Sequence, residues 1–459
     1  MVLSASIDIG TTLIKTAVLQ EKGNLTDIKG IRSPALEGSG LIMETDAKKY
    51  LETATAALNN IKISSNANIP LGIASQRSSF LLWNKETSEP VTPLISWQDR
   101  RAHNWCINNS KRASVPVEKT GLLLSPHYAG PKLAYLLSKD NHLDTACSRG
   151  ELLFGNLETY LIWNWSEGKV HHTDLSMAAR TLMADPLKAA WSDELLDLFK
   201  IPRLILPEIS PTYGLNIPAI QNFTISATIT DQAASLLSLI GKDSDCISIN
   251  LGTGGFLNLP TGNDFRLTPG YLCGPILKGP EGTTLYSLEG TINGISTALE
   301  DLKHIQIELQ QDDPIPDIFC LPETSGMGSP FWKADMPFLL SDENLSDSQK
   351  KCAVIEGIIF RIVNILKDIC PVRLPEYIYI SGGVARESFI SRGLASALMH
   401  PVSVPLERDT TLLGAANLAA GITYEPPLIA EIIKPSEKGH YLADKFADWK
   451  IWADKITKD

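Results

Sequence analysis

The sequence predicts an α/β fold divided into two domains of related architecture. The chain has 459 residues, and at roughly 100–200 residues per domain this length indicates two or three domains. Residues 6–20 and 248–260 resemble each other, because each reads as an apolar strand, a Gly-Thr turn and a second apolar strand. Elsewhere, segments with the spacing of strands alternate with helical segments, which favours α/β layers.

The repeated segments divide the chain near its middle. They start about half a chain length apart, whereas a solenoid would repeat a short period several times. We therefore expect a first domain over residues 1–238 and a second over residues 239–459. Each domain is expected to open with a strand-turn-strand hairpin.

Both hairpin turns have the composition of phosphate-binding loops. Glycine lets the backbone approach an anion closely, and turn amides and threonine hydroxyls can donate to phosphate oxygens. One such turn alone is most often an ordinary hairpin, but matched turns in two halves predict two phosphate clamps that face each other across a cleft. The turn residues are Gly10, Thr11 and Thr12 in the first segment and Gly252, Thr253 and Gly254 in the second.

Later segments continue the alternation of strands and helices. Residues 377–380 read as a buried strand that runs into the pair Gly382 and Gly383. Residues 349–369, 388–399 and 412–420 have the apolar spacing of helices. These elements supply the second domain with its own α/β layers.

Composition narrows the class of protein. The formal net charge of −11 argues against nucleic acid or an anionic membrane as the main partner, although a nucleotide needs only a local cradle of donors. The seven cysteines are scattered singly, which favours reduced thiols in a cytoplasmic protein. No stretch approaches the roughly 20 apolar residues of a membrane span, and Asp8 interrupts the N-terminus before a signal-peptide core could form.

Motifs in a fixed order resemble the FGGY carbohydrate kinases, and within them the glycerol-kinase branch. The likeness runs from about residue 5 to residue 421. Each string is weak alone, but the correct order of all of them is specific. The strings are SIDIGTTLIKTAVL, GIASQRSSFLLW, ISWQDRRA, LSPHYAGPKLAYLL, FGNLETYLIWNWSEGKVHHTDLSMAARTLM, IPRLILPEI, TDQAASLL, NLGTGGF, SLEGTINGI, GMGSPFW, ISGGVARESF and TTLLGAANLAAG.

The resemblance implies the fold, the cofactors and the partners. It implies two ribonuclease-H-like domains of the actin and Hsp70 ATPase type, with an interdomain cleft. It implies ATP and Mg²⁺ as cofactors and a small polyol or sugar as the substrate, and it allows a homodimer. Phosphoryl transfer needs a metal to bridge phosphates, donors to hold them and a base for the accepting hydroxyl.

The resemblance also assigns the nucleotide side of the site. Asp8 matches the magnesium-associated acid, and Lys15 stands where the family places a basic residue near the phosphates, although a solvated lysine is nearly as plausible there. Gly382 and Gly383 resemble the loop under adenine and ribose. Ser296 stands where a glycine is usual in this nucleotide region, and Glu300 and Glu387 also depart from the glycerol-kinase pattern.

Asp231 is the predicted catalytic base. It lies in TITDQAASLL, where a polar pair interrupts an apolar run at a strand-to-helix junction. An aspartate at that place could simply cap the helix. Its match to the family's base position, ahead of the second phosphate motif, favours the catalytic role, and the two roles are compatible.

The substrate side keeps part of the glycerol-kinase pattern and loses another part. Arg77, Trp97 and Gln232 match substrate residues, whereas Ser78 replaces a glutamate and His127 replaces a tyrosine. Both changes shorten side chains, so we expect a larger or differently polar pocket and a polyol or ketose substrate. Two other functions stay open, namely glycerol kinase itself and a non-catalytic regulator that binds sugar or nucleotide. A chaperone or filament ATPase would have no use for the predicted substrate residues.

Overall fold

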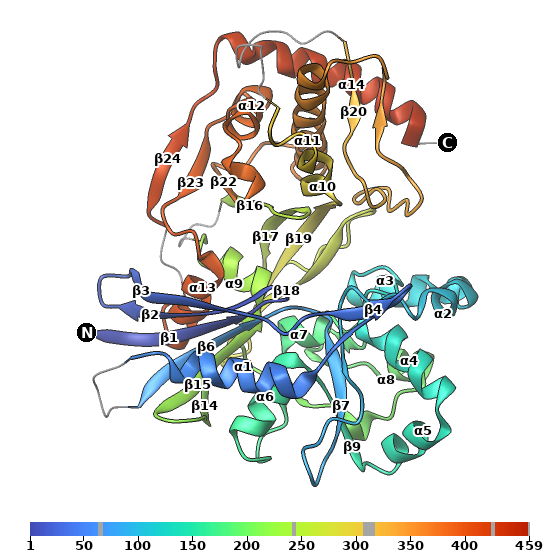
Figure 1. Ribbon diagram of the computed structural model, residues 1–459, viewed down its shortest axis with the longest axis vertical. Helices are drawn as coiled ribbons and strands as arrows, with labels where there is room; N and C mark the ends of the chain where they lie inside the picture. Colours follow the sequence, from blue (N-terminus) through green and yellow to red (C-terminus); the bar gives the residue numbers. More distant parts are fainter. Residues whose placement is uncertain (63–67, 241–244, 306–316, 424–426, 458–459) are drawn as a thin grey trace.

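The structure is a computed structural model that describes residues 1–62, 68–240, 245–305, 317–423 and 427–457. Figure 1 shows two lobes stacked along the long axis, with the N-terminal half in the lower lobe and most of the C-terminal half in the upper lobe. The predicted two-domain α/β fold is confirmed. Within the described ranges, no helix has the length and apolarity needed to cross a membrane.

The lower lobe is built on a six-stranded sheet in the order β14-β15-β6-β1-β2-β3. β1 is antiparallel to β2, which forms the first predicted hairpin, and parallel to β6. β6 is in turn parallel to β15. The strands are β1 (Val2–Ile9), β2 (Leu13–Gln20), β3 (Leu25–Arg32), β6 (Ile69–Ser75), β14 (Tyr213–Pro218) and β15 (Phe223–Thr230).

The upper lobe repeats this arrangement in a seven-stranded sheet, β18-β19-β17-β16-β22-β23-β24. β16 is antiparallel to β17, the second predicted hairpin, and parallel to β22, which is parallel to β23. The repeat found in the sequence is therefore a repeat of topology. The strands are β16 (Cys246–Leu251), β17 (Gly255–Gly262), β18 (Leu272–Lys278), β19 (Thr284–Ile292), β22 (Tyr377–Ser381), β23 (Val402–Pro405) and β24 (Ile429–Ile433).

Smaller sheets complete the two lobes. A five-stranded sheet in the order β4-β5-β8-β7-β9 lies beside the main sheet of the lower lobe. Its strands are β4 (Glu37–Ser39), β5 (Ile42–Thr45), β7 (Phe80–Asn84), β8 (Leu94–Ile95) and β9 (Leu152–Asn156). The two-stranded pairs are β10 (His172–Asp174) with β13 (Glu208–Ser210), β11 (Ala184–Asp185) with β12 (Ala190–Trp191), and β20 (Cys320–Leu321) with β21 (Leu339–Leu340).

Helices cover the sheets of both lobes (Figure 1). The lower lobe contains α1 (Ala47–Asn59), α2 (His103–Asn108), α3 (Ser114–Thr120), α4 (Ala129–Lys139), α5 (Asn141–Ser148), α6 (Leu157–Trp165), α7 (Leu175–Ala179), α8 (Asp193–Phe199) and α9 (Asp231–Leu237). The second half contributes α10 (Ile295–Glu300), α11 (Asp347–Ile369), α12 (Ser388–Leu398), α13 (Thr410–Ala419) and α14 (Tyr441–Thr457). The helical spacing of residues 349–369, 388–399 and 412–420 is thus confirmed by α11, α12 and α13.

Local sequence explains the longest helix. Ser346 and Gln349 form a capping box, in which each side chain satisfies a backbone amide that the first turn leaves unpaired. Most of α11 is buried in the core of the upper lobe, against β20, α12 and α14. Such a helix needs few polar positions, which is why its apolar pattern is easy to recognise.

One helix from the second half of the chain returns to the lower sheet. α13 packs against α9 and against β1 and β6, and the Ser4 hydroxyl donates to the Ala416 carbonyl at 2.7 Å. A Cβ on Gly414 would lie 1.9 Å from the Ala234 carbonyl oxygen, so only glycine lets α13 and α9 approach this closely. The junction between the lobes therefore belongs to both halves of the sequence.

Candidate active site

Three parallel strands of the lower sheet end at one level. The register pairs Ile9 of β1 with Ser75 of β6, and Ser75 with Thr230 of β15. The residues that follow each strand consequently lie along the same edge of the sheet, where open α/β sheets bind their ligands. That edge carries the first hairpin turn after β1, Arg77 shortly after β6, and Asp231 directly after β15.

Asp231 is the first residue of α9, but Thr230 caps the helix. The Thr230 side chain accepts from the Ala233 amide, whereas Asp231 Oδ1 accepts from its neighbour, the Gln232 amide, at 2.8 Å. Burial raises the pKa of the Asp231 carboxyl, and nearby Arg77 lowers it in part. The structure thus separates the capping role from Asp231 and leaves its carboxylate at the sheet edge.

Arg77 belongs to an ion cluster that joins the two lobes. Arg77 Nη1 donates to Glu289 Oε2 at 2.8 Å, and Arg180 Nη2 donates to the same oxygen at 2.7 Å. Glu289 lies on β19 of the upper sheet and its side chain is 3% exposed. Burial alone would raise the pKa of Glu289, but Arg180 and Arg77 lower it to about 2. The carboxylate therefore stays ionised and holds both guanidinium groups.

Arg180 and Glu289 are functional candidates that sequence reasoning missed. Both lie inside segments that carry the family resemblance, FGNLETYLIWNWSEGKVHHTDLSMAARTLM and SLEGTINGI. That resemblance was the available signal, because nothing local marks either residue as a partner of Arg77. Their meeting depends on β19 reaching across to the lower lobe, which is a property of the tertiary structure.

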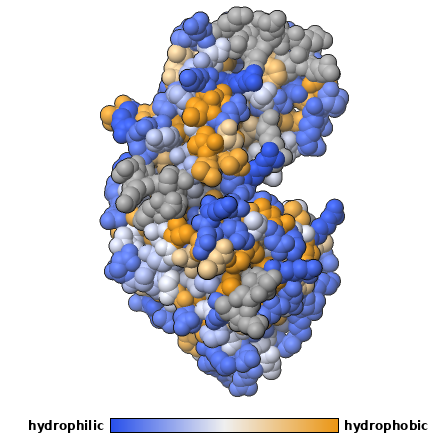
Figure 2. Space-filling model, turned by 90° about the vertical axis from the view of Figure 1, so that its left-hand side faces the viewer, coloured by the Kyte–Doolittle hydropathy of each residue, from blue (hydrophilic) through white to orange (hydrophobic). Residues whose placement is uncertain are grey.

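The ion cluster borders a recess between the lobes. The recess is lined from the lower lobe by Arg77, Arg180 and Gln232, and from the upper lobe by Asn258, Ser287 and Glu289. Gln232 Oε1 is buried there without a hydrogen-bond partner among the described residues. Figure 2 shows the outline of the molecule indented where the two lobes meet. A hydroxyl-bearing ligand could satisfy this orphaned acceptor.

A closed ring of hydrogen bonds places Trp97. The indole N–H of Trp97 donates to Thr11 Oγ1 at 3.0 Å, and the Thr11 hydroxyl donates to Gln76 Oε1 at 2.8 Å. The backbone N–H of Trp97 donates to Ser79 Oγ at 3.0 Å, and the Ser79 hydroxyl donates back to Gln76 Oε1 at 3.3 Å. Thr11, expected to face the nucleotide, thereby also supports the predicted wall of the substrate pocket.

The two residues that depart from the glycerol-kinase pattern have different surroundings. Ser78 is 1% exposed, and its hydroxyl donates to the Arg180 carbonyl at 3.0 Å. Its hydroxyl thus donates within the protein and can still accept, and the expected place of Ser78 beside the substrate stays a prediction. His127 lies edge-on to Trp97 with ring centroids 5.7 Å apart. Burial, followed by the charge of Lys132, lowers the pKa of His127 well below its usual value, so its ring is neutral.

The nucleotide-side segments meet along the two hairpins. Lys15 is paired across the first hairpin with Asp8, and its ammonium donates to Asp409 Oδ1 at 2.5 Å. At the second hairpin, the amide of Ser296 in α10 donates to the Thr253 carbonyl of the turn at 3.3 Å. A Cβ on Gly382, which has φ 97°, would lie 2.3 Å from the Leu251 carbonyl oxygen. The predicted Gly382 loop therefore lies directly against the strand that leads into the second turn, and Gly383 follows it.

Asp8 is the acid of the first hairpin, and the nearby charge of Lys15 does not offset the effect of burial on its pKa. Burial first, then Asp231 and Asp409, raise the pKa of Asp8 to about 7, although Lys15 lowers it. In the described part of the chain, no three acidic, histidine or cysteine side chains form a ready-made metal cage. Mg²⁺ in kinases is usually held by one or two carboxylates together with waters and phosphates. The donor set at Asp8 fits that kind of site.

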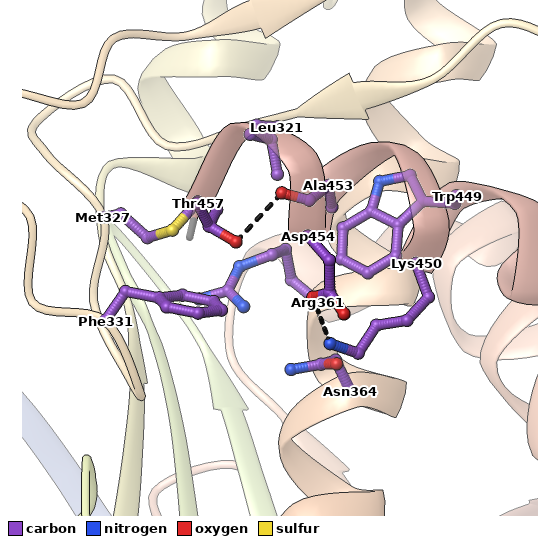
Figure 3. Close-up of a pocket in the computed structure, with 10 residues that line it drawn as sticks. All are labelled: Leu321, Met327, Phe331, Arg361, Asn364, Trp449, Lys450, Ala453, Asp454 and Thr457. Atoms are coloured by element: carbon purple, nitrogen blue, oxygen red, sulfur yellow. Dashed lines mark hydrogen bonds and ion pairs between the residues drawn. The ribbon is translucent and has the colours of Figure 1, made fainter. Parts of the chain in front are cut away.

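A second recess lies far from this edge, in the upper lobe. It lies between α11, α14 and the segment after β20, and Figure 3 shows Arg361 at its centre. Arg361 Nε donates to Glu323 at 2.7 Å with both side chains 1% exposed, and Trp449 Nε1 donates to the Cys320 carbonyl at 2.9 Å. The Trp449 contact joins α14 to the lobe, so this recess is part of the packing of the last helix.

Comparisons with known proteins agree with this geometry. The FGGY family of carbohydrate kinases matches in both parts, its N-terminal domain over residues 3–222 and its C-terminal domain over residues 247–421. "Glycerol kinase" of Agrobacterium fabrum is 29% identical, with 90% of this chain and 89% of that protein covered. "Glycerol kinase" of Brucella ovis is 30% identical, with 81% and 80% covered.

Solved structures give the same result for the fold. A glycerol kinase from Plasmodium falciparum with ADP has a TM-score of 0.86 at 20% identity, with 98% of this chain and 97% of that chain covered. A ligand-bound xylulose kinase from Lactobacillus acidophilus has a TM-score of 0.86 at 20% identity, with 99% and 98% covered. This agreement establishes the ribonuclease-H-like ATPase fold. The chain belongs to the FGGY family of carbohydrate kinases, which are ATP-dependent phosphotransferases acting on sugars or polyols.

Proposed function

We propose that this kinase transfers the γ-phosphoryl group of ATP to a hydroxyl of a polyol or ketose longer than glycerol, with Asp231 as the general base. The observation that carries the proposal is the constellation at the interdomain recess. There Gln232 Oε1 is buried without a hydrogen-bond partner among the described residues, Arg77 also lines the recess, and Asp231 is the residue before Gln232 in α9. These groups could bind one hydroxyl and accept its proton.

Asp231 has the environment of a general base. Burial raises the pKa of its carboxyl, and a base whose pKa lies closer to the working pH accepts a proton more readily. The charge of Arg77 opposes part of this rise in pKa and favours the ionised carboxylate. In the proposed reaction, Asp231 takes the proton of the substrate hydroxyl as its oxygen attacks the γ-phosphorus in line with the departing ADP.

Arg77, Trp97 and Gln232 orient the substrate. Glu289 fixes the Arg77 guanidinium, so its remaining N–H groups point in set directions. The indole of Trp97, held by Thr11, offers a flat wall to the carbons. Gln232 Oε1 accepts from a second hydroxyl. Holding the attacking oxygen in this way supplies much of the rate enhancement in reactions of this class.

The nucleotide is expected between the two hairpin turns, with Gly252 and Thr253 on one side and Gly10 and Thr12 on the other. Asp8 would hold Mg²⁺, and Lys15 would exchange its contact with Asp409 for a phosphate oxygen. When bound, Mg²⁺ would neutralise the charge of the phosphate groups. Ser296, Gly382 and Gly383 adjoin the second turn and support the nucleoside end.

The proposal of a longer substrate rests on Ser78 and His127, which are expected near the end of the substrate opposite the attacking hydroxyl. No glutamate follows Arg77, because the position is Ser78 and its hydroxyl is bound to the Arg180 carbonyl. A three-carbon substrate would lose a charge-assisted hydrogen bond, which is worth about 1.5–3 kcal/mol. His127 is neutral, and neither of its ring nitrogens has a hydrogen-bond partner within the described residues. A longer polyol or ketose could reach this ring.

The test is a coupled assay of ADP release with glycerol and with longer polyols, ketoses and sugar acids. We expect ADP release that depends on a hydroxyl substrate, and a higher kcat/KM for a longer polyol or ketose than for glycerol. His127→Phe should reduce that preference. If glycerol is the best substrate of the panel, the protein is a glycerol kinase, as its relatives' names and the retained Arg77, Trp97 and Gln232 would suggest. If nucleotide binds but no compound releases ADP, the catalytic proposal is wrong and a regulator is favoured.

A further inference from the structure

We infer that Lys132 is a positioning residue that holds Arg77 and Trp97 in one fixed arrangement for substrate binding. The inference rests on the proposed function, and it adds a residue that touches neither the substrate nor the nucleotide. Lys132 lies in α4, one turn after His127 and Tyr128, and its side chain is completely buried.

The ammonium of Lys132 joins the two loops that carry the substrate residues. Its Nζ donates to the Ser96 carbonyl, directly before Trp97, at 2.8 Å. It also donates to the Ser78 carbonyl, directly after Arg77, at 3.2 Å. Arg77 follows β6 and Trp97 follows β8, strands of two different sheets. One side chain from a third element therefore sets the spacing between two backbone segments.

The surroundings of Lys132 are unusual for a cation. Among the described residues, no carboxylate lies within ion-pair distance of its Nζ, which instead lies 5.8 Å from the ring centroid of Phe80. Burial lowers the pKa of this ammonium to about 7, and only Asp99 opposes that shift. A buried, unpaired charge is costly, and an apolar side chain of the same length would fill the space more cheaply. A lysine at this place is explained by the two carbonyls that it binds.

The charge of Lys132 also acts on the third substrate residue. It is the strongest of the cations that, after burial, keep the His127 ring neutral, ahead of Arg100, Arg77 and Arg180. A neutral ring has one nitrogen that donates and one that accepts, so it can bind a hydroxyl in both senses. Lys132 thereby affects the position of two substrate residues and the charge of the third.

The expected KM values differ between a lysine that only stabilises the fold and a lysine that positions substrate residues. If Lys132 only stabilised α4, its loss would lower the amount of folded enzyme without changing KM for either substrate. If it positions Arg77 and Trp97, its loss changes the hydroxyl-substrate site and leaves the nucleotide turns intact. The ratio of the two KM values separates these cases, because it does not depend on the folded fraction.

The experiment compares Lys132→Met with Lys139→Met in the full-length protein. Methionine matches the length of lysine without the ammonium, and Lys139 is an exposed lysine of the same helix. For Lys132→Met we expect KM for the best polyol or ketose to rise about tenfold to a hundredfold, the range expected for a small misplacement of binding groups, with KM for ATP unchanged. Lys139→Met should match the wild type.

Three outcomes would overturn the inference. Equal changes in both KM values, or no change in either, would make Lys132 structural or dispensable while the proposed function stands. A wild-type enzyme without hydroxyl-dependent ADP release would overturn the proposed function and this inference together. If Lys132→Met does not fold, Lys132→Gln replaces it, because its shorter amide keeps a polar group but cannot join both carbonyls, so KM for the hydroxyl substrate should still rise. A Gln variant with wild-type KM for the hydroxyl substrate would then contradict the inference.

Discussion

The two main sheets share one strand order, but the ends of their strands carry different side chains. In the lower sheet, Asp8 stands near the end of β1 and Asp231 follows β15. In the upper sheet, Asn250 occupies the place of Asp8 in the repeated segment, and Ser381 ends β22. The hairpin registers also differ, because Ile9 pairs with Ile14 whereas Leu251 pairs with Gly255. The first hairpin therefore has one more residue in its connection.

This difference separates two tasks within one fold. Carboxylates at the lower edge can bind a cation and accept a proton, whereas amide and hydroxyl groups at the upper edge can only share hydrogen bonds. We infer that the lower sheet carries the groups that bind the cation and accept the proton, and that the upper sheet carries groups that bind the nucleotide by hydrogen bonds. Glu289 is the exception, since it lies on the upper sheet but serves the arginines of the lower lobe.

The largest effect should come from Asp231→Asn. We expect turnover to fall about 10²–10⁴-fold, because the general base is lost while the side-chain shape is kept. Nucleotide affinity and thermal stability should stay close to the wild type, as measured by calorimetry and thermal unfolding. The matched control is Asp193→Asn, which changes an exposed aspartate at the same position of α8, also seven residues long. A well-folded Asp231→Asn enzyme with normal turnover would remove this residue from the mechanism.

The largest loss of stability should come from Glu289→Gln, which removes the charge that pairs with Arg77 and Arg180 between the lobes. Breaking a buried ion pair costs about 3–5 kcal/mol, so we expect a loss in the free energy of unfolding toward the lower end, because Gln keeps one acceptor. The pKa of Glu289 is lowered from 4.5 to about 2, so its stabilisation is complete above pH 4.5 and disappears as the pH falls toward 2. Urea unfolding should show the two proteins converging over that range. Glu281→Gln, on the exposed turn before β19, is the control.

Asp8→Asn should increase the free energy of unfolding, whereas Glu289→Gln lowers it. The change also makes the first hairpin resemble the second. The pKa of Asp8 is raised from 3.8 to about 7, so the ionised carboxylate costs stability that grows as the pH rises from 3.8 to 7. At pH 8 and without Mg²⁺, Asp8→Asn should be more stable by on the order of 4 kcal/mol. The gain should vanish near pH 4, and Mg²⁺-dependent turnover should fall. Asn250→Asp, the reciprocal change, should destabilise the protein at pH 8.

The sequence predicted the hairpins, the buried strand at residues 377–380 and the α11 helix, because each depends on local spacing and turn chemistry. The shared edge of Asp8, Arg77 and Asp231 comes from the structure, in which the parallel strands β1, β6 and β15 end at one level. The expected contact of Ser78 with the substrate stays a prediction, because a small hydroxyl next to a binding residue can turn either way and here donates to the Arg180 carbonyl. Arg180, Glu289 and Lys132 could not be assigned without contacts between distant segments.

The smallest effects should distinguish the two threonines of the hairpin turns. The Thr11 hydroxyl binds Gln76 and accepts from Trp97, whereas Thr253 is exposed at the tip of the second turn. Losing a hydrogen bond of this kind costs about 0.5–1.5 kcal/mol, which is roughly a twofold to tenfold change in an equilibrium constant. Thr11→Val should therefore raise KM for the hydroxyl substrate more than KM for ATP, because Trp97 loses its acceptor. Thr253→Val should raise KM for ATP alone. Both values come from the same two-substrate steady-state measurement. If the two variants gave the same pattern, the first turn would be a phosphate clamp like the second, and the separation of tasks between the sheets would not extend to their turns.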